Sequence, residues 1–389
     1  MKILVLLPRV PYPIEKGDKL RAYNHIRCLS KSNEIHLVAL NDQRLHADAI
    51  STLKPFCSSI TIIPITKFCL LFNLMKVFFS GKPFQVGYFY NKAAQKKINQ
   101  IIQKTKPDHI FCQLIRVAEY VKNINIPKTL DYQDVFSKNV ERRIASSNWI
   151  MKFPLLLEYH RLLQYEHDIF GFFDNKIIIS LPDRNLIPHA DKEKISVIPN
   201  GVDYQFFSPI SKRKQYHLVF TGNMSYPPNI DSVEFLVKKI LPIVHLTNPK
   251  VNLLIAGANP HRKVLALKSD TVTISGWVAD MRLSYASAQI FIAPMRLGTG
   301  LQNKLLEAMS MQMPCITSEL ANEALGATPG KEILIGKSPE EYAHHILHLL
   351  EDAFFAKQLA NNGYQLIYKN YDWEKTTSIL EKIMLSSSK

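Results

Sequence analysis

Short apolar runs rich in β-branched residues alternate with helix-length segments along almost the whole chain. Two strands joined through a helix lie parallel in one sheet, so the alternation predicts doubly wound parallel sheets and an α/β fold class. In the first half the predicted strands are Ile3 to Pro8, Glu34 to Leu40, Ser59 to Ile65, His109 to Leu114, Thr129 to Tyr132 and Lys176 to Ser180. In the second half they are Tyr216 to Thr221, Val251 to Gly257, Thr271 to Gly276, Gln289 to Pro294 and Pro314 to Ser318.

The alternation pauses once, around the turn Asn200-Gly201 and the polar segment Ser208 to Gln215. At 389 residues the chain is too long for one ordinary core, so we expect two Rossmann-like domains in series. A helix at Trp373 to Met384 follows the second domain's pattern and is expected to cross back to the first domain. The predicted segments are a first domain at 1–205, a linker at 206–215, a second domain at 216–370 and the terminal helix segment at 371–389.

Composition is typical of a globular protein that does not span a membrane. Hydrophobic residues make up 47% and charged residues 21% of the chain, so disorder is expected only at the last few residues. The first apolar run stops at Pro8, too early for a signal peptide, and the stretch Phe68 to Phe79 is shorter than the ~20 residues that cross a bilayer. The five cysteines show neither paired nor metal-type spacing. We therefore expect reduced thiols, no metal site and a cytoplasmic location.

The formal net charge of +15 falls mostly on residues 1–200. Between Asp48 and Asp108 there is no acidic residue, and an apolar run lies in the same stretch. Basic charge beside exposed apolar surface favours contact with the inner face of an anionic membrane, and the alternative is a solvated lysine face around a buried helix. Nucleic acid is not expected, because no binding motif accompanies the charge. The lysines are Lys54, Lys67, Lys76, Lys82, Lys92, Lys96, Lys97, Lys104 and Lys106.

The segment Met295 to Glu307 combines a strand end, a glycine loop and a helix start. Glycines let a backbone approach a ligand closely, and the first-turn N–H groups of a helix attract a phosphate. Arg296 and Lys304 add full positive charges. Glu307 lies one turn after Lys304 and can accept hydrogen bonds from hydroxyl groups beside the phosphate. The segment predicts a sugar-phosphate site, and the alternative is a connecting loop in which Glu307 pairs with Lys304.

Other loops also follow predicted strands, where ligands bind in doubly wound sheets. In the first half this loop is Arg9 to Arg21, which includes Gly17, Lys19 and Arg21. In the second half the loops contain Gly222-Asn223, Gly257 and Gly276-Trp277. We expect the two sheets to face a central cleft, with one substrate bound from each side.

These segments agree in order and spacing with one family over essentially the whole chain. The chain resembles GT-B glycosyltransferases of the group 1 (GT4) family. The opening segment, Arg9 to Arg21, is similar to a subgroup associated with exopolysaccharide and other surface-glycan synthesis. The segments that carry the resemblance are Ile198 to Asp203, Phe220 to Asn223, Leu254 to Gly257, Ile274 to Val278, Ala293 to Met309 and Met313 to Ile316.

The resemblance implies transfer of a hexose-type sugar, with retention, from a nucleotide diphosphate sugar to a hydroxyl of a lipid-linked or saccharide acceptor. It implies no cofactor and no metal, because positive groups on the helix can neutralise the leaving diphosphate. The implied catalytic residues are Lys304, Arg296 and Asp134. The implied donor-binding residues are Gly17, Gly222, Asn223, Trp277, Thr299, Gly300, Leu301, Gln302, Asn303, Lys304 and Glu307.

The sequence departs from the family pattern at three places. Thr299 stands where the family has the first of two glutamates, Asn223 to Asn229 replaces an Arg and a Lys, and Gln133 replaces a histidine before Asp134. Asp134 can alternatively cap the helix that follows it. Two other functions therefore remain open, a nucleotide-sugar 2-epimerase of the same fold and a catalytically inactive scaffold.

Overall fold

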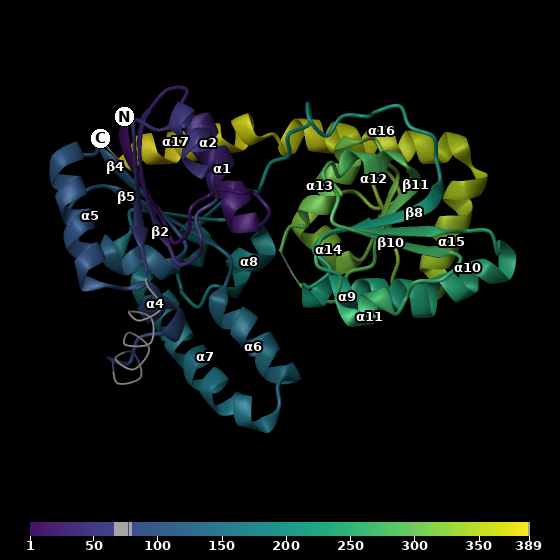
Figure 1. The fold of residues 1–389 in the computed structure, drawn as a ribbon, viewed down its shortest axis with the longest axis horizontal. Helices are drawn as coiled ribbons and strands as arrows, with labels where there is room; N and C mark the ends of the chain where they lie inside the picture. The colour runs from purple at the N-terminus through teal and green to yellow at the C-terminus, as the bar shows by residue number, and fades with distance from the viewer. Residues whose placement is uncertain (66–76, 78–79, 299, 388–389) are drawn as a thin grey trace. The chain divides into compact units, whose positions relative to one another are not determined.

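The computed structural model describes residues 1–65, 77, 80–298 and 300–387, shown as a ribbon in Figure 1. The chain forms two compact units. The first contains Met1–Pro199 and the segment from Trp373 onward, and the second contains Asn200–Asp372. The division falls at Pro199, before the sequence-based boundary at 205, because the following residues bond to the second unit. The Val202 N–H donates to the Tyr371 carbonyl (2.7 Å), and the Ser310 hydroxyl donates to the Phe207 carbonyl (2.8 Å).

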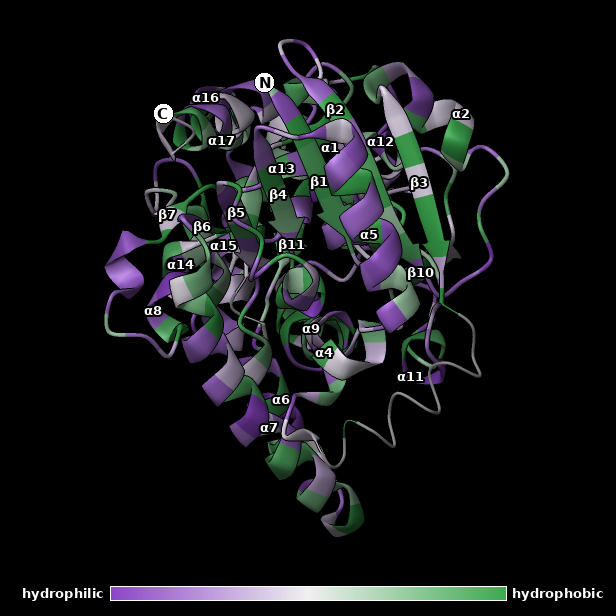
Figure 2. Cartoon of the chain, turned by 90° about the vertical axis from the view of Figure 1, so that its left-hand side faces the viewer, coloured by the Kyte–Doolittle hydropathy of each residue, from purple (hydrophilic) through white to green (hydrophobic). Residues whose placement is uncertain are grey.

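The first unit contains a parallel seven-stranded sheet in the order β3-β2-β1-β4-β5-β6-β7. Ile3 to Leu7 of β1 are fully buried because helices cover both faces of the sheet, and Figure 2 shows the apolar colouring of β1 and β2. The strands are β1 (Lys2–Leu7), β2 (Glu34–Asn41), β3 (Ser59–Pro64), β4 (His109–Gln113), β5 (Lys128–Gln133), β6 (Asn175–Ile178) and β7 (Ser196–Val197).

The helices of the first unit pack around this sheet. The final helix, α17, packs against α1, where Nδ1 of the buried His25 lies 2.9 Å from the Thr377 hydroxyl and the His25 ring meets Trp373 edge-on. The α-helices are α1 (Gly17–Leu29), α2 (Ala49–Leu53), α4 (Phe84–Phe89), α5 (Lys92–Thr105), α6 (Phe136–Ser146), α7 (Trp149–Ile169), α8 (Leu181–Leu186) and α17 (Trp373–Ser387). Short 3-10 helices lie at Lys54–Phe56, Ile115–Tyr120, Phe170–Phe172 and Lys192–Lys194.

The second unit contains a parallel six-stranded sheet in the order β10-β9-β8-β11-β12-β13. The expected two parallel Rossmann-like sheets are therefore confirmed. The strands are β8 (Tyr216–Thr221), β9 (Leu253–Ala256), β10 (Val272–Gly276), β11 (Ala288–Ala293), β12 (Cys315–Thr317) and β13 (Leu334–Ile335).

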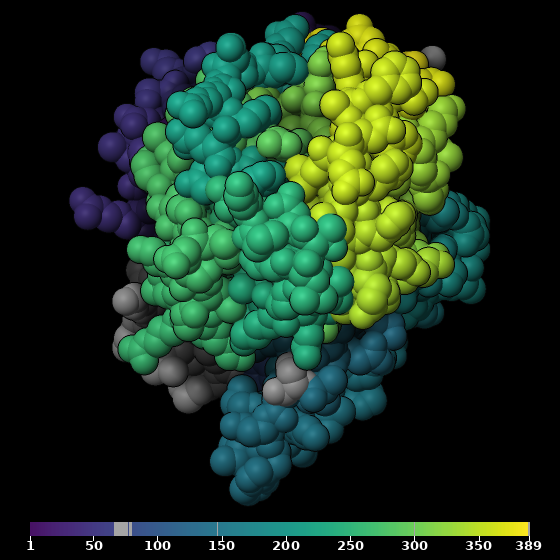
Figure 3. All heavy atoms as spheres, turned by 90° about the vertical axis from the view of Figure 1, so that its right-hand side faces the viewer, coloured from purple at the N-terminus to yellow at the C-terminus, as the bar shows by residue number. Residues whose placement is uncertain are grey.

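Helices cover the second sheet, and α16 is part of the yellow surface in Figure 3. Three of them begin at the side chains of Ser318, Ser338 and Asp352, which accept a hydrogen bond from the first turn. The helices are α9 (Pro227–Phe235), a π-helical segment (Leu236–Ile240), α10 (Leu241–Thr247), α11 (Arg262–Leu265), α12 (Arg282–Ala286), α13 (Asn303–Ser310), α14 (Glu319–Leu325), α15 (Pro339–Glu351) and α16 (Ala353–Asn370).

The structure shows that Asp134 does not cap α6, contrary to the alternative role considered from the sequence. The Asp134 Oδ1 accepts the Val135 N–H (3.0 Å), which lies before the first residue of the helix. The first helical N–H groups, of Phe136 and Ser137, instead donate to Oε1 of Glu166 (2.7 and 3.3 Å). A fully buried carboxylate from α7 therefore caps α6 and ties the two helices together.

This cap predicts a pH-dependent stability. Burial raises the pKa of Glu166 to about 7, although the hydrogen bonds from Ser137 and Phe136 lower it. The stabilising contribution of a group with a raised pKa is complete below its unfolded value, about 4.3, and is lost as pH rises through 7. We expect Glu166→Gln to become more stable relative to the wild type, by up to about 3 kcal/mol, between about pH 4 and pH 8. Urea unfolding at both pH values measures this. Exposed Glu15→Gln serves as control, and an equal change in both variants would contradict the expectation.

Candidate functional site

The second sheet reverses its winding at β8, which lies between β9 and β11. Ligands of doubly wound sheets bind outside the carboxyl ends of the strands at such a reversal. The loop after β8 begins at Gly222, and the loop after β11 runs from Pro294 into α13. The motif chosen from the sequence therefore lies at the expected binding edge.

Lys304, in the first turn of α13, lies between these two loops. Its ammonium donates to the Asn229 Oδ1 and lies 4.5 Å from the ring centroid of Phe220. Asn229 is itself fixed, because its Nδ2 donates to the Asn223 carbonyl (2.9 Å). Burial lowers the pKa of Lys304 to about 7, and Glu307 opposes that shift. An anion placed here would restore the full charge of Lys304.

The start of α13 adds backbone donors to the Lys304 ammonium. Its N-cap residue, Gln302, makes no capping hydrogen bond and donates its Nε2–H to the Gly300 carbonyl (2.8 Å). The first N–H groups of a helix have no acceptor within their own helix, although in α13 the Leu305 N–H already donates to the Gln302 carbonyl (2.9 Å). The N–H groups and the positive end of the helix dipole therefore reinforce the charge of Lys304.

Glu307 lies one turn further along α13 and is half-buried. Its Oε2 accepts a hydrogen bond from the buried Tyr285 hydroxyl (2.6 Å), whose oxygen lies 2.8 Å from the Thr221 Oγ1 at the end of β8. Burial raises the pKa of Glu307 to about 7, while Tyr285 and Lys304 lower it. Glu307 and Lys304 attract each other electrostatically, while their hydrogen bonds in the described structure go to Tyr285 and Asn229.

The glycines after β8 and β9 fit tightly together. Gly222 has φ +148°, and a Cβ there would lie 2.7 Å from Nδ2 of Asn229 and 3.4 Å from Nζ of Lys304. Gly257 has φ +147°, and a Cβ there would lie 1.7 Å from the Gly222 carbonyl oxygen. These two positions therefore require glycine, and the space beside Lys304 depends on it.

We expect Gly222→Ala to weaken nucleotide-sugar binding about tenfold or more and to destabilise the protein by about 1–3 kcal/mol. The new methyl group would displace Asn229, the partner of Lys304. Calorimetric titration and urea unfolding measure the two effects. Gly330→Ala is the matched control, because Gly330 has φ +76° but its Cβ would meet nothing within 4 Å. Equal affinity in both variants would contradict the role of Gly222.

Arg296 is engaged differently from Lys304. Its guanidinium forms a two-point ion pair with Asp231 of α9 (3.0 and 2.6 Å) and stacks over the Phe235 ring at 4.5 Å. The side chain is 50% exposed. A phosphate would have to compete with the Asp231 carboxylate for Arg296, so Lys304 is the better phosphate candidate.

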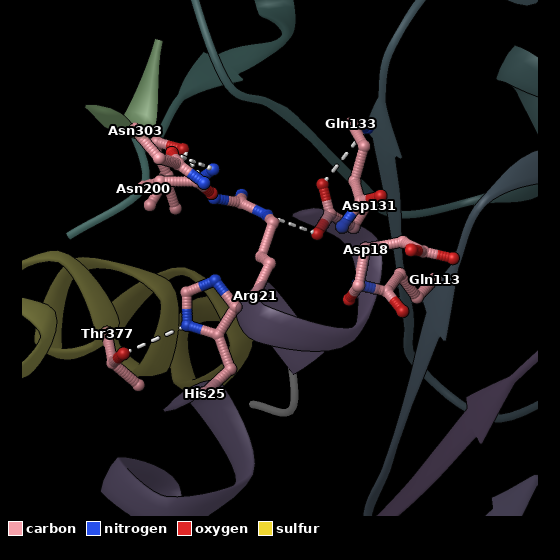
Figure 4. A network of polar contacts seen from close by, with 10 residues as sticks. Asp18, Arg21, His25, Gln113, Asp131, Gln133, Asn200, Asn303 and Thr377 are labelled. Atoms are coloured by element: carbon pink, nitrogen blue, oxygen red, sulfur yellow. Dashed lines mark hydrogen bonds and ion pairs between the residues drawn. The ribbon is translucent and has the colours of Figure 1, made fainter. Parts of the chain in front are cut away.

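Of the other predicted donor residues, Gly17 lies in the first unit, whereas Trp277, Asn223, Gly300, Leu301 and Asn303 lie in the second. Trp277 follows β10 and is 69% exposed, which leaves its indole ring available for stacking. The Asn223 side chain closes a local turn by accepting the Ser225 N–H (3.0 Å). Gly300 and Leu301 are half-buried, and Asn303 accepts a hydrogen bond from Asn200 (3.1 Å; Figure 4). Thr299 lies outside the described residues.

The first unit carries its own group of polar side chains at the carboxyl ends of its strands. Gln133 ends β5 with φ +57°, an unusual conformation for this residue type. Asp134 follows it and is exposed, while Gly17 begins α1 with open space around its α-carbon. Arg9, Asp42 and Arg116 follow β1, β2 and β4 around the reversal of the first sheet.

Four polar side chains at this edge of the first sheet each contain one buried atom that has no hydrogen-bond partner among the described residues. Burial and then Arg9 lower the pKa of Arg116 to about 10, so these groups interact electrostatically. Buried polar atoms are normally hydrogen-bonded, and an unpaired group of them at the edge of a sheet marks a candidate binding site. The atoms are Nε of Arg9, Oδ1 of Asp42, Nε of Arg116 and Nε2 of Gln133.

The acid-free lysine stretch is only partly described. Lys67, Lys76 and the apolar run from Phe68 fall outside the described residues, except for Val77. Lys82 forms an ion pair with Glu119. Lys92, Lys96, Lys97 and Lys104 belong to α5. Within the described residues, no helix has both the length and the apolar character required to cross a membrane.

Sequence reasoning missed the contacts of three residues that hold the candidate donor site together, namely Asn229, Tyr285 and Thr221. Asn229 binds Lys304, and Tyr285 connects Glu307 with Thr221. Asn229 follows two prolines, a sequence that is typical of a turn. Tyr285 fits the pattern of an ordinary apolar helix face. Only the spatial neighbourhood identifies their roles.

Comparison with known proteins finds the same fold in glycosyltransferases. Residues 215–352 match the family model described as glycosyl transferases group 1. An uncharacterised 44.6 kDa protein from the cps region of Klebsiella pneumoniae is 23% identical over 98% of this chain and 99% of its own length. Sucrose-phosphate synthase from Thermosynechococcus elongatus has a TM-score of 0.71 at 15% identity and 99% coverage of both chains. HepE from Anabaena, solved with UDP and glucose, has a TM-score of 0.69 at 15% identity, covering 99% of this chain and 100% of its own.

Proposed function

We propose that this chain, which has the GT-B fold and whose residues 215–352 match the family model of the group 1 glycosyl transferases, is a retaining hexosyltransferase of surface-glycan synthesis. It moves a sugar from a nucleotide diphosphate sugar to a hydroxyl of a lipid-linked or saccharide acceptor. The relative from a cps region supports the glycan assignment, and the HepE complex with UDP supports a nucleotide-sugar donor.

The observation that carries the proposal is the position of Lys304. A partly buried ammonium at a helix start, beside two glycine loops and at the reversal of the sheet, is suited to a diphosphate. Its lowered pKa means that an anionic ligand is needed to hold it fully charged near neutral pH. A connecting loop with a solvated basic rim would not bury this amine.

In the proposed donor complex, Lys304 and the N–H groups at the start of α13 hold the diphosphate. Glu307, oriented by Tyr285, accepts hydrogen bonds from the ribose hydroxyls, and Trp277 stacks on the base. Gly222 and Gly300 let the backbone approach the ligand. Asn223, Leu301, Gln302 and Asn303 shape the two loops.

During transfer, the bond between the anomeric carbon and the diphosphate oxygen breaks and a bond to the acceptor oxygen forms. Lys304 and the helix dipole stabilise the negative charge that develops on the leaving diphosphate. We propose that this neutralisation needs no metal. Retained activity after treatment with EDTA would support that part, and full loss that is restored by Mg²⁺ would contradict it.

The acceptor is proposed to bind the first unit at the group formed by Arg9, Asp42, Arg116 and Gln133. Carboxylate, guanidinium and amide groups together can bind several sugar hydroxyls. The exposed Asp134 carboxylate, directly after Gln133, is the candidate that receives the proton of the acceptor hydroxyl. Gly17 permits a close approach of the backbone at the start of α1.

The test is a donor screen. The full-length protein is incubated with separate nucleotide sugars, with and without a membrane extract, and released nucleotide and labelled glycan are measured. The proposal predicts that one or a few donors release nucleotide only when acceptor is present. Conversion of the donor without acceptor would identify a 2-epimerase, and absence of binding to every donor would identify an inactive scaffold.

A further inference from the structure

The α6–α7 hairpin ends in a group of exposed apolar side chains. These residues, here called the hairpin tip, occupy the first two turns of α7. Their exposed fractions are 82% for Trp149, 62% for Ile150, 46% for Met151, 73% for Phe153 and 42% for Leu156. Figure 2 shows the hairpin projecting from the first sheet, with apolar colour at its end. A contiguous exposed apolar group of this kind marks an interaction surface.

The apolar exposure is confined to the end of the hairpin. Along the inner face of α7, Leu155, Leu162 and Ile169 are buried in the core of the first unit. On the outer face, the exposed residues beyond the first two turns include the polar His160 and Gln164. The hairpin tip is therefore a local feature of α7.

The charges around the hairpin tip are positive. Arg142 and Arg143 end α6, and Lys152 lies within the hairpin tip. No acidic residue occurs between Glu141 and Glu158. Glu141 pairs with Lys138 (2.9 Å), and the buried Glu158 accepts the N–H groups of Phe84 and Gln85 (2.6 and 3.1 Å).

We propose that the hairpin tip inserts into an anionic lipid surface. Trp and Phe prefer the boundary between headgroups and acyl chains, and neighbouring Arg and Lys add attraction to anionic headgroups. A second copy of the chain fits this surface less well, because a symmetric pairing of two tips would bring like charges together. The proposal does not depend on the glycosyltransferase activity.

Vesicle flotation of the full-length protein tests the proposal. We expect binding to vesicles of about three parts phosphatidylcholine to one part phosphatidylglycerol, much weaker binding to pure phosphatidylcholine, and weakening by salt. The double variant Trp149→Ser/Phe153→Ser should bind at least about tenfold more weakly. Phe354→Ser is the matched control, because Phe354 is 80% exposed in the second unit. It should bind as the wild type does.

Tryptophan fluorescence locates the contact. The chain contains three tryptophans, and Trp373 is buried, so Trp277→Phe leaves Trp149 as the exposed one. Anionic vesicles should shift the emission of this variant to shorter wavelength, and the further change Trp149→Phe should remove the shift. Failure of the wild type to bind vesicles would overturn the proposal, as would unchanged binding of the double variant. A wild-type dimer that the double variant converts to a monomer, without any change in vesicle binding, would show an interface between copies instead.

Discussion

Lys304→Met is expected to weaken binding of the donor nucleotide sugar at least about 100-fold, equivalent to nearly 3 kcal/mol. The variant keeps an apolar chain of similar length over Phe220 but removes the ammonium that the diphosphate would contact. Transfer should fall further than binding, because charge on the leaving diphosphate grows in the transition state. Calorimetry and initial rates with the donor from the screen measure the two effects.

Lys268→Met provides the control for Lys304→Met, because Lys268 is an exposed lysine of the same unit. It should leave donor affinity and transfer unchanged. Lys304→Arg keeps the charge but places a larger planar group between Asn229 and Phe220, so it should recover only part of the affinity. Full activity of Lys304→Met would remove Lys304 from the mechanism.

Arg21→Met is expected to destabilise the first unit by about 3–5 kcal/mol. Arg21 and Asp131 are both fully buried, and the Arg21 Nε donates to Asp131 (2.6 Å), as Figure 4 shows. The Arg21 Nη1 also donates to the Ile198 carbonyl (2.9 Å), where β7 leads out of the first unit. Burial raises the pKa of Asp131 and Arg21 lowers it, so removal of Arg21 leaves a buried carboxylate uncompensated.

The pH dependence separates this cause from lost packing. Without Arg21, the folded pKa of Asp131 rises further above its unfolded value, so the remaining stability should be greatest in acid and be lost as pH increases. The double variant Arg21→Met/Asp131→Asn should recover much of the lost stability. Urea unfolding followed by the buried Trp373, with Trp149 and Trp277 changed to Phe, reports on the first unit. A double variant as unstable as Arg21→Met would contradict the charge argument.

Periodicity identified the main strands because buried parallel strands are continuous apolar runs. The run from Ile3 to Leu7 is fully buried in β1, and Tyr216 to Thr221 matches β8. Two-residue strands such as Ser196–Val197 and Leu334–Ile335 are too short to show a period, so the sequence did not indicate them.

The sequence predicted those residues of the candidate site that belong to one short segment. It did not predict the contacts between segments that are far apart in the sequence. Gly222 and Lys304 carry signals in their own segments, because a glycine loop and a helix start are short-range features. Asn229 and Tyr285 act on α13 from other segments of the second unit, and no spacing rule connects them with Lys304. For the same reason, Asp134 was considered as the cap of α6 although Glu166 of α7 provides it.

The most direct test of the central claim is calorimetric titration of the full-length protein with the screened nucleotide sugar near pH 7, in two buffers of different ionisation enthalpy. Because the pKa of the free Lys304 is about 7 and a bound diphosphate raises it, binding should take up protons. In Glu307→Gln, which removes the carboxylate that raises the pKa of Lys304, the free ammonium loses its proton at lower pH, so affinity should begin to fall with increasing pH earlier than in the wild type. Proton uptake that disappears in Lys304→Met is the predicted result. The same proton uptake and affinity in Lys304→Met, or no binding of any nucleotide sugar to the wild type, would contradict the assignment of the donor site.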